Sequence, residues 1–287
     1  MTILFHYCSM TTFASMVSNK SLWLSAVSQS NDYMEGKLVS QAVERLSKRD
    51  GLETSATVRI QDAMDLMESM LDGLAFCLSE DGDLLSQWRG YASDASGLSI
   101  GFASDYLERL VTGSCGQNYA GLNLQQIKYE TEEHDALVEP TYLEMRRLLD
   151  SGALRLTGRR GLLDVRTDEQ IAADDKAIRS AQMGLNVAAL ALIGHLFLLK
   201  SSAFKEEREW RLVSYLMKPL PDDCLYRVRG QDLVPYRQYE MSELQRGAIR
   251  EVILGPKQST PIRVVENFLK SNGFPDVRVS KSNASYR

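Results

Sequence analysis

Glu207 and Glu209 lie where a charged cluster leads into an apolar, strand-like segment, Trp210 to Leu216. Because side chains alternate along a strand, Glu207, Glu209 and Arg211 are expected to share one face. Two carboxylates this close repel each other, which raises the pKa of at least one of them. Such a pair is tolerated when both carboxylates point into solvent, or when a ligand uses them. From these residues alone, two interpretations remain: a solvent-exposed start of a strand, or a binding site.

His6 is the second candidate, at the end of an expected first strand, Ile3 to Tyr7, and just before Ser9. Strand ends that adjoin loops often carry functional groups. A structural role for His6 stays open, because no Ser-His-Asp or Cys-His order stands out. His195 is expected to be a hydrogen-bonded core histidine and not a catalytic one.

Two further groups each allow two interpretations. Trp88, Tyr91 and Phe102 could stack on a base or a nicotinamide, or they could belong to the core. Asp32 and Glu35, followed by a lysine, superficially resemble the acidic metal sites of nucleases, although they lead into an amphipathic helix where such sites use a strand.

Composition excludes several classes of protein. A formal net charge of -5 argues against a broad phosphate-binding face. Four cysteines at irregular spacing suit reduced thiols in a cytoplasm, not a disulfide framework or a zinc site. No secretory signal is visible at the N-terminus. The apolar run from Val187 to Leu199 is shorter than the roughly twenty residues of a membrane span, and it predicts a helix buried on nearly all sides.

Short strands and helices are expected to alternate over the first hundred residues. Strands are predicted around residues 3–7, 22–24, 75–79 and 98–102, with helices at 12–17, 38–46 and 60–74. The middle is expected to be helical, with Pro140 in a first turn, Gly152 at a helix end, and Thr167 with Gln170 as a capping box. A strand from Glu209 and a final strand–helix–strand unit complete one α+β domain over 1–287, with a helical insertion at roughly 132–200.

Short motifs in the same order along the chain resemble the bacterial family catalogued as domain of unknown function 2971. Near the N-terminus they are His6-Tyr7-x-Ser9, Leu22-Trp23 and Asn31-Asp32-x-x-Glu35. Further along they are Phe76-x-x-Ser79, Leu85-x-x-Trp88-x-x-Tyr91-Ala92, Gly97-x-x-Ile100-Gly101-Phe102 and Phe204-x-x-Glu207-x-Glu209-Trp210-Arg211. Leu254-Gly255-Pro256 and Ser285-Tyr286-Arg287 also fit. The name of this family assigns no activity.

More remotely, the chain resembles ADP-ribosyltransferases. Their fold carries a His or Arg on the first strand, a Ser or Tyr on a middle strand, and a Glu on a late strand, with Glu-x-Glu in arginine-modifying members. By this resemblance His6 corresponds to the first element, Ser79 or Tyr91 to the second, and Glu209 to the third. The resemblance implies an α+β fold with mixed and antiparallel sheets of the ADP-ribosyltransferase type. The middle element departs from the family pattern, because neither a Ser-Thr-Ser triplet nor a Tyr-Phe strand occurs here.

The implied reaction breaks the nicotinamide–ribose bond of NAD through an oxocarbenium-like cation, as in glycoside hydrolysis. Glu209 would hold a ribose hydroxyl and stabilise the developing charge, a contribution of roughly 3 to 4 kcal/mol. His6 would bind a second ribose hydroxyl, and Glu207 would orient or deprotonate the acceptor. Tyr91 would stack on the nicotinamide.

The other residues expected to contact NAD are Ser9, Ser79, Trp88 and Arg211, and no metal is required. The first hypothesis is therefore a cytoplasmic, NAD-using ADP-ribosyltransferase-like enzyme, as a toxin or an antiphage effector. Its acceptor would be protein, nucleic acid or water. The second hypothesis is a nucleotide-binding or sensor module that keeps the fold without the chemistry. The third is a metal-dependent nuclease that uses the acidic residues near Asp32 and Glu35.

Overall fold

The computed structural model describes residues 2–29, 34–114, 121–158, 161, 164–220, 224–229, 231–241 and 247–286. The sequence predictions that involve Asp32, Cys115 and Arg287 therefore lie outside the described residues.

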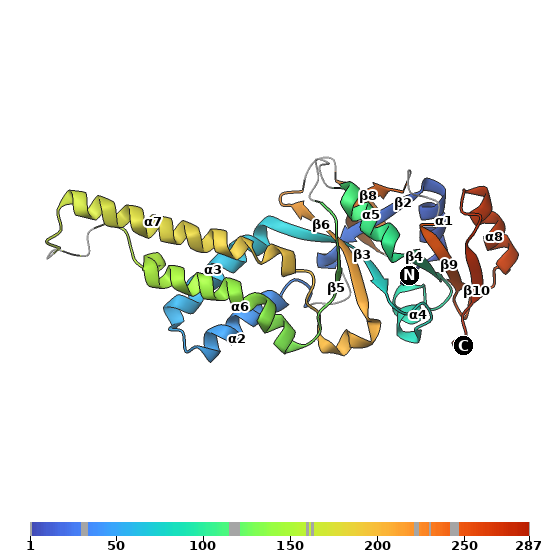
Figure 1. Cartoon of the computed structure of the whole chain (residues 1–287), viewed down its shortest axis with the longest axis horizontal. Coiled ribbons are helices and arrows are strands. Elements are labelled where there is room, and N and C mark those ends of the chain that lie inside the picture. The colour runs from blue at the N-terminus through green and yellow to red at the C-terminus, as the bar shows by residue number, and fades with distance from the viewer. Residues whose placement is uncertain are drawn as a thin grey trace.

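The described chain forms an α+β structure around a mostly antiparallel open sheet (Figure 1). Strands follow the order β10-β9-β4-β1-β3-β2-β8-β7, and β6 and β5 continue from β3 off this path. The pair β9–β10 is parallel, and the other pairs between these strands are antiparallel. The strands are β1 Ile3–Cys8, β2 Ser21–Ala26, β3 Leu71–Ser79, β4 Leu98–Ala103, β5 Asn123–Gln126, β6 Glu209–Met217, β7 Leu225–Arg229, β8 Asp232–Glu240, β9 Ile249–Leu254 and β10 Arg278–Lys281.

The sheet divides at β3, and this division matters for the site. One edge of β3 pairs with β6 along its whole length, from Leu71 to Ser79. The other edge pairs with β2 at Leu74 and Ala75 and with β1 only at Ser79. Strands β1 and β2 thus separate along the middle of that edge and leave the backbone around Cys77 without a strand partner there. The carbonyl at this place is therefore free to accept from a donor outside the sheet.

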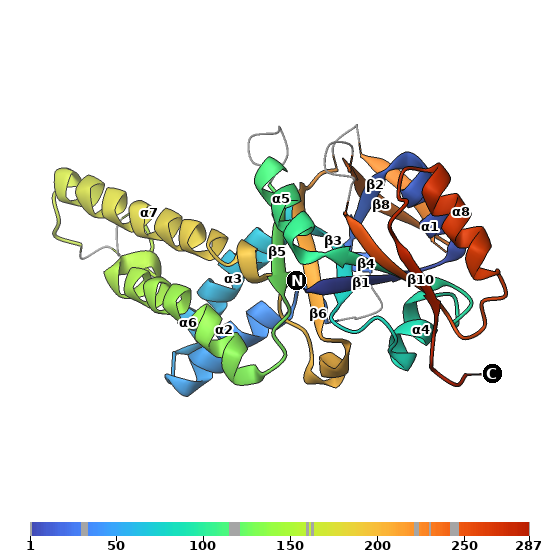
Figure 2. The ribbon, with the colours of Figure 1, turned by 45° about the vertical axis from the view of Figure 1, so that its right-hand side comes forward.

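Four of the eight α-helices in the described part of the chain form an arm that projects to one side of the sheet, as both views show (Figures 1 and 2). They are α2 Leu38–Arg49, α3 Thr54–Met70, α6 Thr131–Leu148 and α7 Asp168–Leu190. The remaining helices lie beside the sheet: α1 Met10–Asn19, α4 Leu85–Tyr91, α5 Ser104–Ser114 and α8 Ile262–Ser271. The arm has its own apolar cluster, in which Val39, Ile60, Tyr142 and Leu185 are buried. The predicted insertion at 132–200 is therefore only half of the helical layer, because α2 and α3 pack against it.

Several local predictions are confirmed and others are wrong. Thr167 and Gln170 form the predicted capping box that opens α7. The first helix, predicted at 12–17, begins earlier: Ser9 caps α1, and its hydroxyl accepts the Thr12 backbone N–H. Pro140 lies inside α6 and not in its first turn. The segment that carries Trp88 and Tyr91, between the strands predicted at 75–79 and 98–102, is the short helix α4, for which no element was predicted.

The apolar run from Val187 to Leu199 is not one buried helix. Helix α7 ends at Leu190, and a 3-10 turn covers Ile193–His195. One face of α7 is exposed, with Met183 70% and Val187 58% accessible. By length and composition the stretch Asp168–His195 could cross a membrane, a criterion that helices packed inside folded domains also meet. The His195 side chain makes no hydrogen bond to the described residues, so the prediction of a hydrogen-bonded histidine is wrong.

Candidate active site

A cavity of about 700 Å³ opens beside the division in the sheet. Its walls come from β1, α1, β2, β3, α4 and β7, and from the segment around Lys200 that leads into β6. This volume lies within the range of roughly 300 to 1,000 Å³ that small-molecule sites occupy.

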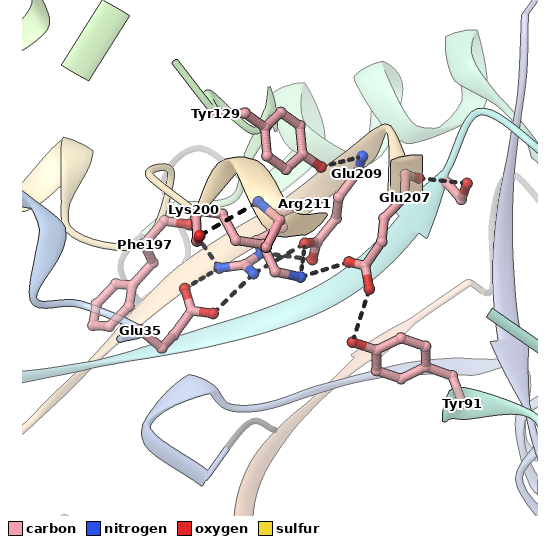
Figure 3. Close-up of polar contacts among 11 residues, drawn as sticks. Glu35, Tyr91, Tyr129, Phe197, Lys200, Glu207, Glu209 and Arg211 are labelled. Carbon is pink, nitrogen blue, oxygen red and sulfur yellow. Dashed lines mark hydrogen bonds and ion pairs between the residues drawn. The ribbon is translucent and has the colours of Figure 1, made fainter. Parts of the chain in front are cut away.

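Lys200 holds the two glutamates of the Glu-x-Glu motif together (Figure 3). Its ammonium lies 2.6 Å from Glu207 Oε2 and 2.8 Å from Glu209 Oε2. The three side chains are almost fully enclosed, with 4%, 9% and 6% exposure for Lys200, Glu207 and Glu209. The cation of Lys200 therefore offsets the repulsion between the two carboxylates. The sequence analysis considered only solvent or a ligand for this role.

Arg211 extends this network toward Glu35. Its guanidinium donates to Glu209 Oε1 at 2.7 Å and to Glu209 Oε2 at 3.1 Å. On its other side it forms an ion pair with Glu35, and it donates to the Phe197 carbonyl at 2.9 Å. Two-point pairing of this kind fixes a carboxylate in one orientation. Glu209 is thereby fixed in the network.

Glu207 and Glu209 do not both lie on a strand. Glu207 ends the 3-10 segment Ser202–Glu207, and β6 begins at Glu209. Arg208 between them adopts a left-handed conformation with φ of 43°, which turns the chain. The Ser79 hydroxyl donates to the Glu207 carbonyl at 2.7 Å, and the Tyr129 hydroxyl accepts the Glu209 N–H at 2.9 Å (Figure 3). The prediction that both glutamates share a strand face by alternation is therefore wrong, although both reach Lys200.

The two carboxyl groups titrate differently. Burial raises the pKa of Glu207 above its ordinary value, and Lys200 opposes this only in part. Burial would also raise the pKa of Glu209, but Arg211 and Lys200 outweigh it and lower that pKa to about 2. The repulsion from Glu209, predicted from the spacing, adds to the raised pKa of Glu207, but burial is the larger cause.

The network leaves one carboxylate incompletely neutralised. Fully ionised, it contains three carboxylates against the cations Lys200 and Arg211, which leaves one excess negative charge. Glu209 has both oxygens in ion pairs, whereas the described residues give Glu207 Oε1 only the Tyr91 hydroxyl, at 3.4 Å. Glu207 is thus the carboxylate of the pair with an oxygen available to a ligand.

His6 provides a hydrogen-bond acceptor in the same cavity. Its Nδ1 lies 2.8 Å from the Cys77 carbonyl, the group that the division in the sheet leaves without a strand partner. Because a carbonyl oxygen only accepts, Nδ1 carries the proton. Burial lowers the pKa of His6 to about 4, so at neutral pH the ring is uncharged and Nε2 is unprotonated. The Phe76 ring stacks on the imidazole at 4.0 Å and fixes its plane.

Most of the residues singled out from the sequence meet at this cavity. The ones that line it are His6, Ser9, Tyr91, Glu207, Glu209 and Arg211. Ser79 and Trp88 do not line it. Ser79 supports the backbone at Glu207, and Trp88 is fully buried against Tyr7 and donates from Nε1 to Asp83.

Other cavity residues were not found from the sequence. Lys200, directly after the apolar run that ends at Leu199, was not singled out, and Arg227 and Arg229 lie on β7, a strand that was not predicted. Glu35 had been considered as part of a family motif and of a nuclease site, and it is the buried partner of Arg211. Among the described residues, no group of three or more His, Cys, Asp or Glu side chains is arranged to hold a metal ion.

Comparison with known proteins agrees with the motif resemblance in one part of the chain. No curated protein and no solved structure matches the chain. A family model does match residues 87–212, which run from α4 through the arm to the first residues of β6 and include Tyr91, Lys200 and the Glu207–Arg211 segment. The family to which this part of the chain is similar is described as "Protein of unknown function (DUF2971)".

Proposed function

We propose that this protein cleaves the nicotinamide–ribose bond of NAD and transfers the ADP-ribose to an acceptor. One observation carries the proposal: His6, near the N-terminus, and the Glu207–Glu209 pair, late in the chain, line one accessible cavity. The division in the sheet that exposes the Cys77 carbonyl to His6 supports the same assignment, because it opens the space between them.

The charges in the cavity suit this reaction. When the bond between ribose C1′ and the nicotinamide nitrogen breaks, its electron pair leaves with nicotinamide, and the ribose becomes an oxocarbenium-like cation. Fully ionised, the network around Lys200 carries one excess negative charge, and its side chains are almost fully enclosed. Fixed charges in such a place stabilise a developing cation more than water does. An acceptor then adds to C1′ and releases its proton.

Glu207, His6 and Tyr91 receive direct roles in this proposal. Glu207 Oε1 accepts from a ribose hydroxyl and places its charge near C1′. His6 Nε2 accepts from a second ribose hydroxyl, which orients the sugar. Tyr91, 40% exposed on α4, offers a ring for the nicotinamide.

Glu209 is assigned a positioning role. Arg211 and Lys200 occupy both of its oxygens, so it orders the cations that surround Glu207. In this proposal Glu207 contacts the ribose directly, a role that the resemblance to ADP-ribosyltransferases would give to Glu209.

The experiment is to incubate the purified chain with NAD and measure released nicotinamide and ADP-ribose by chromatography, with and without a cell lysate as acceptor source. Glu207→Gln should reduce turnover about 100-fold, in line with the loss of one preorganised electrostatic group. Glu266→Gln, on the exposed face of α8, is the matched control and should turn over NAD like wild type. If wild type releases no nicotinamide but binds NAD in a calorimetric titration, the protein is a binding module and the enzymatic proposal fails.

A further inference from the structure

Arg227 is a cation in the cavity wall without a counter-ion among the described residues. It lies on the edge strand β7 and lines the cavity with its neighbours Val228 and Arg229. Its Nε atom is buried and makes no hydrogen bond to the part of the chain that the structure describes. These residues also offer it no ion pair, which is unusual for a half-buried guanidinium with an enclosed Nε.

Arg229 makes the local charge more positive. Its guanidinium donates to the Gln29 carbonyl, a neutral group, and no carboxylate of the described residues pairs with it. Burial lowers the pKa of Arg227, and repulsion from the nearby Arg229 lowers it further. A buried cation next to another cation lowers stability unless an anion joins them.

Two parts of the cavity wall therefore differ in charge. The Lys200 network, when fully ionised, carries an excess negative charge, whereas the wall at β7 carries two cations. Ser9 and Thr11 also line the cavity, at the start of the ten-residue helix α1, whose N-terminus adds partial positive charge. The Arg227 charge also acts on His6 and Cys8 of β1, which line the same cavity.

We propose that Arg227 and Arg229 form an anion subsite that holds the diphosphate of a dinucleotide, while the sugar to be transferred lies at the Lys200 network. The identity of the dinucleotide as NAD rests on the proposed function; the diphosphate subsite does not. Guanidinium groups bind phosphate oxygens by paired hydrogen bonds, so a diphosphate supplies both the charge and the acceptors that the buried Nε lacks.

The test is a calorimetric titration of wild type, Arg227→Gln and Arg227→Lys with ADP-ribose, inorganic pyrophosphate and adenosine. Loss of one guanidinium contact should raise the Kd for ADP-ribose and for pyrophosphate at least tenfold in Arg227→Gln, with partial recovery in Arg227→Lys. Binding of adenosine should be unchanged. Arg263→Gln, at an exposed arginine of α8, is the control and should bind like wild type. A circular dichroism melt confirms that each variant is folded.

The outcomes separate this inference from the proposed function. If ADP-ribose and pyrophosphate bind in an Arg227-dependent way but NAD is never cleaved, the subsite stands and the enzymatic proposal falls. If NAD is cleaved and Arg227→Gln changes neither KM nor the Kd for ADP-ribose, the subsite is wrong and the enzymatic proposal stands. Equal affinity of wild type and Arg227→Gln for pyrophosphate also overturns the subsite.

Discussion

Lys200 lies between Glu207 and Glu209, at 2.6 and 2.8 Å from their oxygens, with almost no contact with solvent. Burial would lower the pKa of this lysine, but Glu209, Tyr91 and Glu207 raise it above its ordinary value. The charge on Lys200 is therefore part of the folded state, and its removal leaves buried carboxylates without their cation.

Lys200→Met is expected to reduce the free energy of unfolding by about 3 kcal/mol or more at pH 7, because an uncompensated buried charge is left behind. Urea denaturation measures this. Lys205→Met removes an exposed lysine that pairs with Glu130, and it should leave the urea midpoint nearly unchanged. Equal effects of the two substitutions would contradict the role given to Lys200.

The raised pKa of Glu207 predicts the acidic limb of the activity profile. Glu207 must be ionised to face the ribose cation, so NAD turnover should fall as the pH drops through a pKa above the ordinary value of 4.5. Glu209, with a pKa of about 2, stays ionised over that range. Rates of nicotinamide release between pH 4 and 8 test this. An acidic limb below the ordinary glutamate pKa would contradict it.

Because of His6, the stability of the fold is expected to decrease as the pH falls. Its pKa is about 4 in the folded protein against 6.5 in an unfolded chain, so the unfolded state binds the proton first as the pH falls. The contribution of His6 to stability is complete above pH 6.5 and decreases between 6.5 and 4. Denaturation of wild type and His6→Gln at pH 7 and 4.5 should show a larger loss for wild type. A parallel loss in both would count against a buried, neutral imidazole.

At the scale of elements, Gly73 in β3 allows Phe197 to approach the strand. A Cβ atom at Gly73 would lie 2.4 Å from Cδ2 of the Phe197 ring, closer than packed atoms tolerate. The Phe197 carbonyl in turn accepts from Arg211 at 2.9 Å, so this contact helps to place the network.

Gly73→Ala is expected to destabilise the fold by about 1–3 kcal/mol through overpacking and to slow NAD turnover by shifting Arg211. A thermal melt and the nicotinamide assay measure the two effects. Gly113→Ala, in α5, meets no neighbouring atom within 4 Å and should show neither effect. Normal NAD turnover in Gly73→Ala would contradict the role given to Phe197 in positioning Arg211.

The elements that could be predicted are those whose apolar pattern has one interpretation. The strands at 3–7, 22–24 and 98–102, the helix at 38–46 and the helix of the final strand–helix–strand unit lie where the residues indicate. Leu71 and Leu74 continue the three-to-four spacing of α3 but belong to β3, because sheet pairing overrides a local pattern that fits both periods. Strand β5 is missed because its residues, Asn123–Gln126, are mostly polar, at the edge of the sheet.

At the scale of the whole molecule, the site joins segments that only the fold brings together. Glu207, Glu209 and His6 could be singled out because their types and neighbours are distinctive. Lys200 and Arg227 could not, since a lysine after an apolar run and an arginine on an edge strand are ordinary surface features in a sequence. Their importance comes from burial and from the charges of distant neighbours.

The most direct test of the central claim is a crystal structure with an NAD analogue whose nicotinamide–ribose bond cannot be cleaved. The account predicts the nicotinamide ribose between His6 Nε2 and Glu207 Oε1, with hydroxyls within hydrogen-bond distance of both, and the diphosphate at Arg227. An analogue bound outside this cavity, or a ribose that contacts neither His6 nor Glu207, would contradict it.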